Sequence, residues 1–140
     1  MQAGTYATVP AAAVLAWLAR RHDLAVRLAL GGTAAWLLGK AVKPLGRRAR
    51  PPALLADVRV RDRFGDDLGW VSGHAAVAAT LGLIAQPELP RSSLPALGAV
   101  TAAVGFGRMY VGAHLPLDVV GGYGLGLMLG AVAAGERAER

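Results

Sequence analysis

The sequence predicts an all-α fold, a membrane helical bundle of about five helices. The 140-residue chain is 54% hydrophobic and only 17% charged. Its apolar residues gather in five segments of roughly the length that crosses the ~30 Å apolar layer of a bilayer. Alanine and leucine dominate these segments without period-two alternation, which disfavours strands. We expect a single domain over residues 1–140, because a chain of this length seldom holds two.

The five apolar segments run approximately Ala3–Ala19, Leu24–Val42, Leu68–Ala85, Leu94–Val111 and Leu115–Ala134. The last three reach spanning length if a few polar residues are tolerated. The first two are marginal. Pro10 interrupts the first, while Arg27 and Lys40 lie near the ends of the second, where long basic side chains can extend to the membrane surface. The alternative is the buried core of a soluble bundle, but too little polar surface remains to solvate one.

The ends and connections of these segments carry most of the charge. No basic residue precedes the first segment, and Arg20 and Arg21 follow it, so a cleaved signal peptide is not expected. The connection from Lys43 to Gly69 is the only long one. Its first part, rich in proline and arginine, cannot continue a helix past Lys43. Its second part mixes arginine and aspartate, which predicts either a self-paired solvated loop or a rim that attracts an anionic headgroup.

The composition limits the possible partners. The net charge of +6 is compatible with nucleic acid, anionic lipid or a phosphorylated substrate. Nucleic acid is the weakest of these, because the basic residues lie between apolar stretches and form no basic helix interleaved with aromatic residues. The chain has no cysteine, which excludes disulfides and thiolate metal sites.

Three short polar clusters lie at the ends of the apolar segments. They are Lys43-x6-Arg50-Pro51, Ser72-Gly73-His74 and Arg108-x5-His114-x3-Asp118. If all five segments span a membrane, these clusters all lie on the same side of it. Together they supply three fixed cations, two histidines and one carboxylate, which is the equipment for holding a phosphate, attacking it and protonating the group that leaves.

Each cluster also has a plain structural interpretation when it is taken alone. His114 and Asp118 are four residues apart and share a face if a helix starts near Pro116 or earlier, which is typical of a polar pair at a helix start. A carboxylate on one ring nitrogen would nevertheless leave the other free as base or nucleophile. Ser-Gly-His at a helix start reads as a cap, or as an anion site built from free backbone N–H groups. Lys43 and Arg50 are typical of the basic residues that follow a membrane helix, or they could bind phosphate oxygens as cations.

The three clusters together resemble the signature of the type 2 phosphatidic acid phosphatase superfamily, which includes bacterial acid phosphatases and vanadium haloperoxidases. That signature is Lys-x6-Arg-Pro, Pro-Ser-Gly-His and Ser-Arg-x5-His-x3-Asp. The first part is intact here, while Val71 replaces the proline of the second part and Gly107 replaces the serine of the third. The resemblance covers roughly residues 40 to 120 and keeps both the order and the spacing of the motifs.

The resemblance implies a role for each matching position. His114 would be the nucleophile that forms a phosphohistidine, Asp118 would orient it, and His74 would be the general acid. The non-bridging phosphate oxygens would be bound by Lys43, Arg50, Arg108, Ser72 and the backbone at Gly73. The phosphatase branch requires no metal and no other cofactor.

The implied protein is an integral membrane phosphatase with a PAP2-like core, in a bacterial cell membrane, acting on a lipid phosphate. Polyprenyl phosphates or diphosphates are the first expectation for the substrate, and phosphatidate or phosphatidylglycerol phosphate is the alternative. A non-catalytic membrane protein that binds lipid headgroups is the rival from another class. Membrane members of the family usually have six helices, so five segments indicate a compact variant or a missing first helix. Basic residues outside the three clusters divide evenly between the two sides, so charge does not assign the site to a membrane face.

Overall fold

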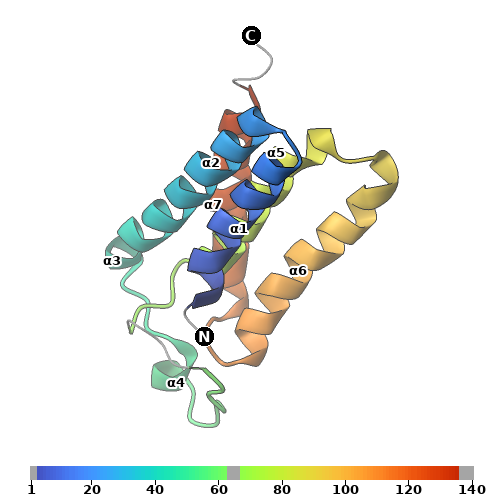
Figure 1. Cartoon of the computed structure of the whole chain (residues 1–140). Helices are drawn as coiled ribbons and strands as arrows, with labels where there is room; N and C mark the ends of the chain where they lie inside the picture. The colour runs from blue at the N-terminus through green and yellow to red at the C-terminus, as the bar shows by residue number, and fades with distance from the viewer. Residues whose placement is uncertain (1–2, 63–66, 136–140) are drawn as a thin grey trace.

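The computed structural model describes residues 3–62 and 67–135, and within these ranges the chain is helical (Figure 1). The prediction of an all-α fold is confirmed, since the described residues contain no β structure beyond one isolated bridge between Ala49 and Leu68. Two short 3₁₀ turns, Gln86–Glu88 and Arg91–Ser93, link α5 to α6. The helices are α1 (Ala3–Leu18), α2 (His22–Ala41), α3 (Lys43–Gly46), α4 (Pro51–Leu54), α5 (Gly73–Ala85), α6 (Leu94–Tyr110) and α7 (Pro116–Gly135).

The five long helices correspond to the five predicted apolar segments, with α2 starting two residues earlier and α7 ending one residue later than predicted. The third apolar segment was predicted from Leu68 with the Ser72-Gly73-His74 cluster at its helix start, and α5 does begin at Gly73, after an extended Ser72. The reason for this start is a local pairing with the stretch before α4, in which the Gly69 N–H donates to Arg48 O at 2.8 Å. Helix α2 ends at Ala41 and, as expected, does not continue past Lys43, where the separate one-turn helix α3 starts.

Helix α5 lies at the centre of the bundle and packs against α1, α2 and α7. The hydrophobic core consists of small and branched side chains from α1, α2 and α5, with Ala35 and Ile84 fully buried. A Cβ atom added at Gly31 would lie 2.5 Å from the Ile84 side chain, so α2 and α5 are in close contact. This packing fixes the direction of α5 and therefore the position of its first turn.

Glycines on one face of α7 bring that helix against α5. Gly122, Gly126 and Gly130 recur every four residues and are all buried. A Cβ at Gly126 would collide with the Ala76 carbonyl oxygen, and one at Gly130 would lie 2.8 Å from Leu83 Cβ. Such spacing of small residues lets helix backbones approach closely. It also holds the start of α7 beside the start of α5.

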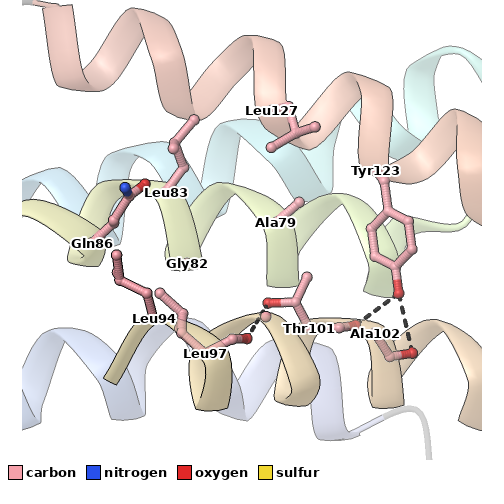
Figure 2. Close-up of a pocket in the computed structure, with 11 residues that line it drawn as sticks. Ala79, Gly82, Leu83, Gln86, Leu94, Leu97, Thr101, Ala102, Tyr123 and Leu127 are labelled. Carbon is pink, nitrogen blue, oxygen red and sulfur yellow. Dashed lines mark hydrogen bonds between the residues drawn. The ribbon is translucent and has the colours of Figure 1, made fainter. Parts of the chain in front are cut away.

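Helix α6 stands apart from α2, on the other side of the bundle (Figure 1). Between α5, α6 and α7 lies an apolar cavity of about 490 Å³, whose lining includes Leu97, Thr101 and Leu127. Figure 2 shows the Tyr123 side chain reaching across from α7 to α6, where its hydroxyl donates to Thr101 O at 2.7 Å and accepts from Gly105 N at 3.1 Å. None of the residues in the three polar clusters lines this cavity.

One described helix, Pro116–Gly135, is long and apolar enough to cross a membrane, and Ala7–Leu18 is a shorter apolar helix. The 13 residues of α5 extend only about 20 Å at 1.5 Å per residue, less than the apolar layer of a bilayer. The crossing of a membrane by all five segments therefore stays a prediction.

Candidate active site

The three predicted polar clusters meet at one end of the bundle. The connection between α2 and α5 and the turn between α6 and α7 both lie there, at the lower end in Figure 1. Two hydrogen bonds join them: Ser72 N–H donates to Asp118 O at 2.8 Å, and Arg50 Nη1 donates to Ala113 O, 63 positions away, at 2.8 Å. Within the connection itself, Lys43 Nζ donates to Leu68 O at 3.0 Å.

His114 lies at the centre of this site, in the turn before α7. It is 5% exposed, and the positive charges of Arg50, Arg108 and Lys43 act on it. Burial is the largest cause, and these cations add to it, of a pKa for His114 that is lowered from the ordinary 6.5 to about 3. The imidazole is therefore neutral at physiological pH, and a neutral ring nitrogen has the lone pair that a nucleophile needs.

Asp118 follows His114 in the first turn of α7 and is completely buried. The prediction that α7 starts near Pro116 is confirmed, and the two side chains are close together. Asp118 Oδ2 lies 3.8 Å from His114 Nδ1, beyond hydrogen-bond distance, and accepts a hydrogen bond of 2.7 Å from the Leu115 N–H. The carboxylate is thus adjacent to the ring, while the backbone of the same turn holds one of its oxygens.

Ser72 and Gly73 form the N-terminus of α5. The Ser72 side chain is fully buried, and its Oγ has no hydrogen-bond partner among the described residues. It caps no backbone N–H of α5, and a Cβ at Gly73 would meet nothing within 4 Å. A buried hydroxyl without a partner is costly unless a ligand forms the missing hydrogen bond with it. Free N–H groups, an unpartnered hydroxyl and open space together make this helix end suited to an anion.

The predicted cations surround this helix end. Lys43 and Arg50 are 9% and 8% exposed, which is unusual for basic residues and places their charges inside the protein. Arg108 donates from Nη1 to Asp62 Oδ2 at 2.8 Å, while its Nε is buried without a partner among the described residues. His74, in the first turn of α5, is partly buried and lies in the electrostatic field of Arg108, Asp62 and Lys43.

The two departures from the family signature have different surroundings. A Cβ at Gly107 would meet nothing within 4 Å, so a serine would fit there without any shift of the backbone. Val71 is 5% exposed and therefore packs as a buried apolar residue before the helix. Relative to the signature, Gly107 removes a hydroxyl, whereas Val71 removes no charged or hydroxyl group.

Two residues of the site were not predicted from the sequence. Arg48 Nη1 lies 3.4 Å from Asp118 Oδ1, and Asp62 pairs with Arg108. The sequence offers no signal that distinguishes Arg48 from its neighbour Arg47, which is exposed. Asp62 was expected in a self-paired loop, and the structure instead places it against α6.

The loop before α5 is held on the α6–α7 turn by contacts close to Asp62. Arg61 N–H donates to Val111 O at 3.0 Å, and its guanidinium lies 4.6 Å from the centre of the Tyr110 ring. Gly112, at φ 75°, has no room for a Cβ because the Arg59 carbonyl oxygen would be 3.0 Å away. These contacts fix the part of the loop that carries Asp62. Residues 63–66 of the same loop lie outside the described ranges.

The assembled site suits a multiply charged anion. The site contains four basic side chains, Lys43, Arg48, Arg50 and Arg108, and two carboxylates, of which Asp118 pairs with Arg48 and Asp62 with Arg108. The described residues contain no group of three or more histidine, cysteine, aspartate and glutamate residues that could hold a metal ion. The guanidinium and ammonium groups and the helix N-terminus offer positive charge to an anion.

Comparisons with known proteins identify relatives in sequence and fold. An undecaprenyl-diphosphatase of Sulfolobus acidocaldarius is 29% identical over 122 residues, which cover 86% of this chain and 59% of that protein. The chain thus spans less than two thirds of the length of this relative. The crystal structure of Aquifex aeolicus LpxE matches with a TM-score of 0.81 at 24% identity, covering 93% of this chain and 77% of the other.

A second solved structure has a similar fold. It is a transmembrane PAP2 type phosphatidylglycerolphosphate phosphatase from Bacillus subtilis, with a TM-score of 0.73 at 27% identity, covering 94% of this chain and 66% of that one. The match to the PAP2 superfamily itself extends over residues 23–136 and includes all three polar clusters. From the fold, the site and this match, the chain belongs to the PAP2 superfamily.

Proposed function

We propose that this protein is an integral membrane lipid phosphatase that works through a phosphohistidine at His114. The observation that carries the proposal is the convergence of Lys43, Arg50 and Arg108 on a buried, neutral His114. These cations face the N-terminus of α5, where the Ser72 hydroxyl has no partner within the described chain. A phosphoryl group placed there would satisfy that hydroxyl and neutralise the excess positive charge.

The reaction has two balanced steps. In the first, a ring nitrogen of His114 attacks phosphorus, the bond to the leaving oxygen breaks, and His74 donates a proton to that oxygen. In the second, His74 removes a proton from water, the hydroxide oxygen attacks phosphorus, and the phosphorus–nitrogen bond breaks to release inorganic phosphate. The three cations stabilise charge on the equatorial oxygens in both steps. Metal independence is part of this proposal, because guanidinium and ammonium groups supply the positive charge.

The membrane location is supported by apolar side chains on the outside of the bundle. Leu15 on α1, Leu30 on α2, Phe106 on α6 and Met128 on α7 are 65% to 69% exposed. A soluble protein rarely exposes large apolar side chains on so many helices. Lipid chains would cover this surface, and the site at one end of the bundle would then meet the headgroup layer. A bacterial cell membrane is the proposed location.

The substrate class follows from the named relatives. The Sulfolobus relative is named for a prenyl diphosphate, which favours polyprenyl phosphates or diphosphates of the cell envelope. The Bacillus structure is named for a glycerolipid phosphate, which keeps phosphatidylglycerol phosphate and phosphatidate as the second candidate class. A phosphate pocket formed by cations and a helix N-terminus serves both classes, because it contacts only the group they share.

Phosphate release in detergent with EDTA present tests the function. Prenyl diphosphates, phosphatidylglycerol phosphate and phosphatidate would be compared on the wild type, His114→Ala and His22→Ala, where His22 is an exposed histidine at the opposite end of α2. We expect release that tolerates EDTA, is lost in His114→Ala and is retained in His22→Ala. Equal release by the wild type and His114→Ala would contradict the mechanism. The absence of release from every lipid by a folded protein would favour a non-catalytic headgroup-binding protein.

A further inference from the structure

Asp118 carries a buried charge whose two oxygens have different surroundings. Its side chain is completely buried. Oδ2 accepts from Leu115 N–H and faces His114 Nδ1, whereas Oδ1 has no hydrogen-bond partner among the described residues. A buried carboxylate oxygen without a hydrogen-bond partner is costly unless a nearby positive charge compensates it.

Arg48 is the cation in position to supply that charge. Its Nη1 lies 3.4 Å from Asp118 Oδ1. Other basic groups of the site contact other atoms: Lys43 donates to Leu68 O and Arg50 to Ala113 O. Arg108 pairs with Asp62. Within the described residues, Arg48 is the cation that forms an ion pair with Asp118, and the neutral His114 ring lies beside the same carboxylate.

The backbone explains why Arg48 reaches this place. Its carbonyl accepts from Gly69 N–H at 2.8 Å, and the neighbouring residues Ala49 and Leu68 form an isolated antiparallel bridge. Gly69 in turn lies against Asp118, since a Cβ there would be 3.1 Å from Oδ2. The paired segments 48–50 and 67–69 therefore lie beside the start of α7, and Arg48 extends from the pair to the carboxylate.

We propose that Arg48 is a positioning residue, which compensates the buried Asp118 carboxylate and keeps it oriented toward His114. This inference rests on the proposed function for its effect on activity. The Asp118 carboxylate would accept a hydrogen bond from His114 Nδ1–H while the other ring nitrogen attacks phosphorus, and it would stabilise the positive charge that develops on the ring. The Arg48 side chain is 30% exposed, so it bridges this buried carboxylate to the solvent side of the site. Arg48 thus acts through Asp118 and not on the phosphate.

A double-mutant cycle tests this route. Arg48→Gln should lower kcat by about tenfold with little change in KM, within the range of coupling between residues in contact. Arg48→Lys should recover part of the rate. Arg47→Gln, a matched loss of charge at the exposed neighbour, should leave the rate unchanged. In an Asp118→Asn background, Arg48→Gln should cause no further loss. An additional tenfold loss in that background, or a rise in KM alone, would overturn the proposal.

A measurement that needs no turnover separates this proposal from the function on which it rests. In protein labelled with ¹⁵N-histidine, Arg48→Gln should move the His114 Nδ1 resonance in the same direction as Asp118→Asn, and Arg47→Gln should leave it in place. An unmoved Nδ1 resonance in Arg48→Gln would overturn the positioning role. If the wild type releases no phosphate from any lipid, the proposed function fails while this spectrum still decides the role of Arg48.

Discussion

Arg108 and Asp62 form an ion pair of 2.8 Å inside the candidate active site, with side chains that are 15% and 8% exposed. The Asp62 carboxylate is thus bound to the guanidinium of Arg108, which is the arginine of the third motif in the family signature. In the proposed mechanism, Asp62 thus neutralises part of the positive charge that would bind the substrate. A phosphate that binds there would displace this carboxylate or share Arg108 with it.

The Asp62→Asn substitution should therefore strengthen the binding of phosphate analogues. Removing the carboxylate frees the charge of Arg108 and removes a like-charge repulsion of about 1 kcal/mol, which corresponds to roughly fivefold tighter inhibition by vanadate. Asp57→Asn, the same change at an exposed position of the same loop, is the control. Weaker inhibition by vanadate in Asp62→Asn would show that Asp62 supports the phosphate site and does not compete with it.

The pKa of His114, lowered to about 3, predicts the behaviour of the ring in acid. The imidazole should stay neutral from pH 5 to 8, because burial and then Arg50 and Arg108 oppose its protonation. The unfolded chain binds this proton near pH 6.5 and the native protein does not. Acidification from 6.5 toward 3 therefore lowers the free energy of unfolding, and the contribution is constant above 6.5.

Titration of the His114 side chain by NMR checks this prediction. Its resonances should not move between pH 5 and 8 in the wild type. Arg50→Gln should bring the titration to higher pH, since it removes the largest of the cationic contributions. A wild-type midpoint near 6.5 would mean that the ring is hydrated and distant from the three cations, against the geometry described above.

The contact between α5 and α7 predicts unequal effects of two glycine substitutions on the same helix. Gly126→Ala places a Cβ against the Ala76 carbonyl oxygen and 2.8 Å from Ala79 Cβ, whereas Gly124 is exposed with nothing within 4 Å of an added Cβ. Gly126→Ala should lower the free energy of unfolding by about 1–3 kcal/mol, the usual cost of overpacking. Gly124→Ala should be neutral or slightly stabilising.

Thermal unfolding in detergent compares the two variants. Since Ser72 and Asp118 lie at the site end of these same helices, Gly126→Ala should also reduce phosphate release. Equal melting temperatures for Gly126→Ala and Gly124→Ala would mean that α5 and α7 are further apart than the structure places them.

The sequence predicted the helices and the named clusters because both depend on local signals. The lengths of the apolar segments predicted α1, α2, α6 and α7. The spacing within the three motifs identified the polar residues of the clusters, from Lys43 in the first motif to Asp118 in the third. The Ser72-Gly73-His74 cluster also indicated the start of α5 correctly. The pairing of Gly69 with Arg48 before that start was not predicted, because it is a contact between segments that composition does not encode. Leu68, Trp70 and Val71 are apolar enough to continue a helix, but that pairing holds the stretch extended.

The sequence also did not predict Arg48 and Asp62 as residues of the site, because contacts between segments again determine their positions. Arg47 and Arg48 are adjacent and chemically identical, and only the backbone determines which one faces Asp118. Arg47 adopts φ 45°, which ends α3 and is followed by the paired segment that carries Arg48 to the carboxylate. Asp62 is one of several aspartates in a charged loop, and it is selected by the contacts of Arg61 with Tyr110 and Val111.

The central claim, a covalent phosphohistidine at His114, is tested most directly by trapping the intermediate. Wild type, His114→Ala and His74→Ala would be mixed with a ³²P-labelled lipid phosphate and quenched in alkali, in which phosphohistidine survives. The account predicts label on a single peptide containing His114 in the wild type, slower labelling and slower loss of label in His74→Ala because His74 acts in both steps, and no label in His114→Ala. Turnover of the lipid by the wild type with no label on that peptide, or by His114→Ala, would contradict it.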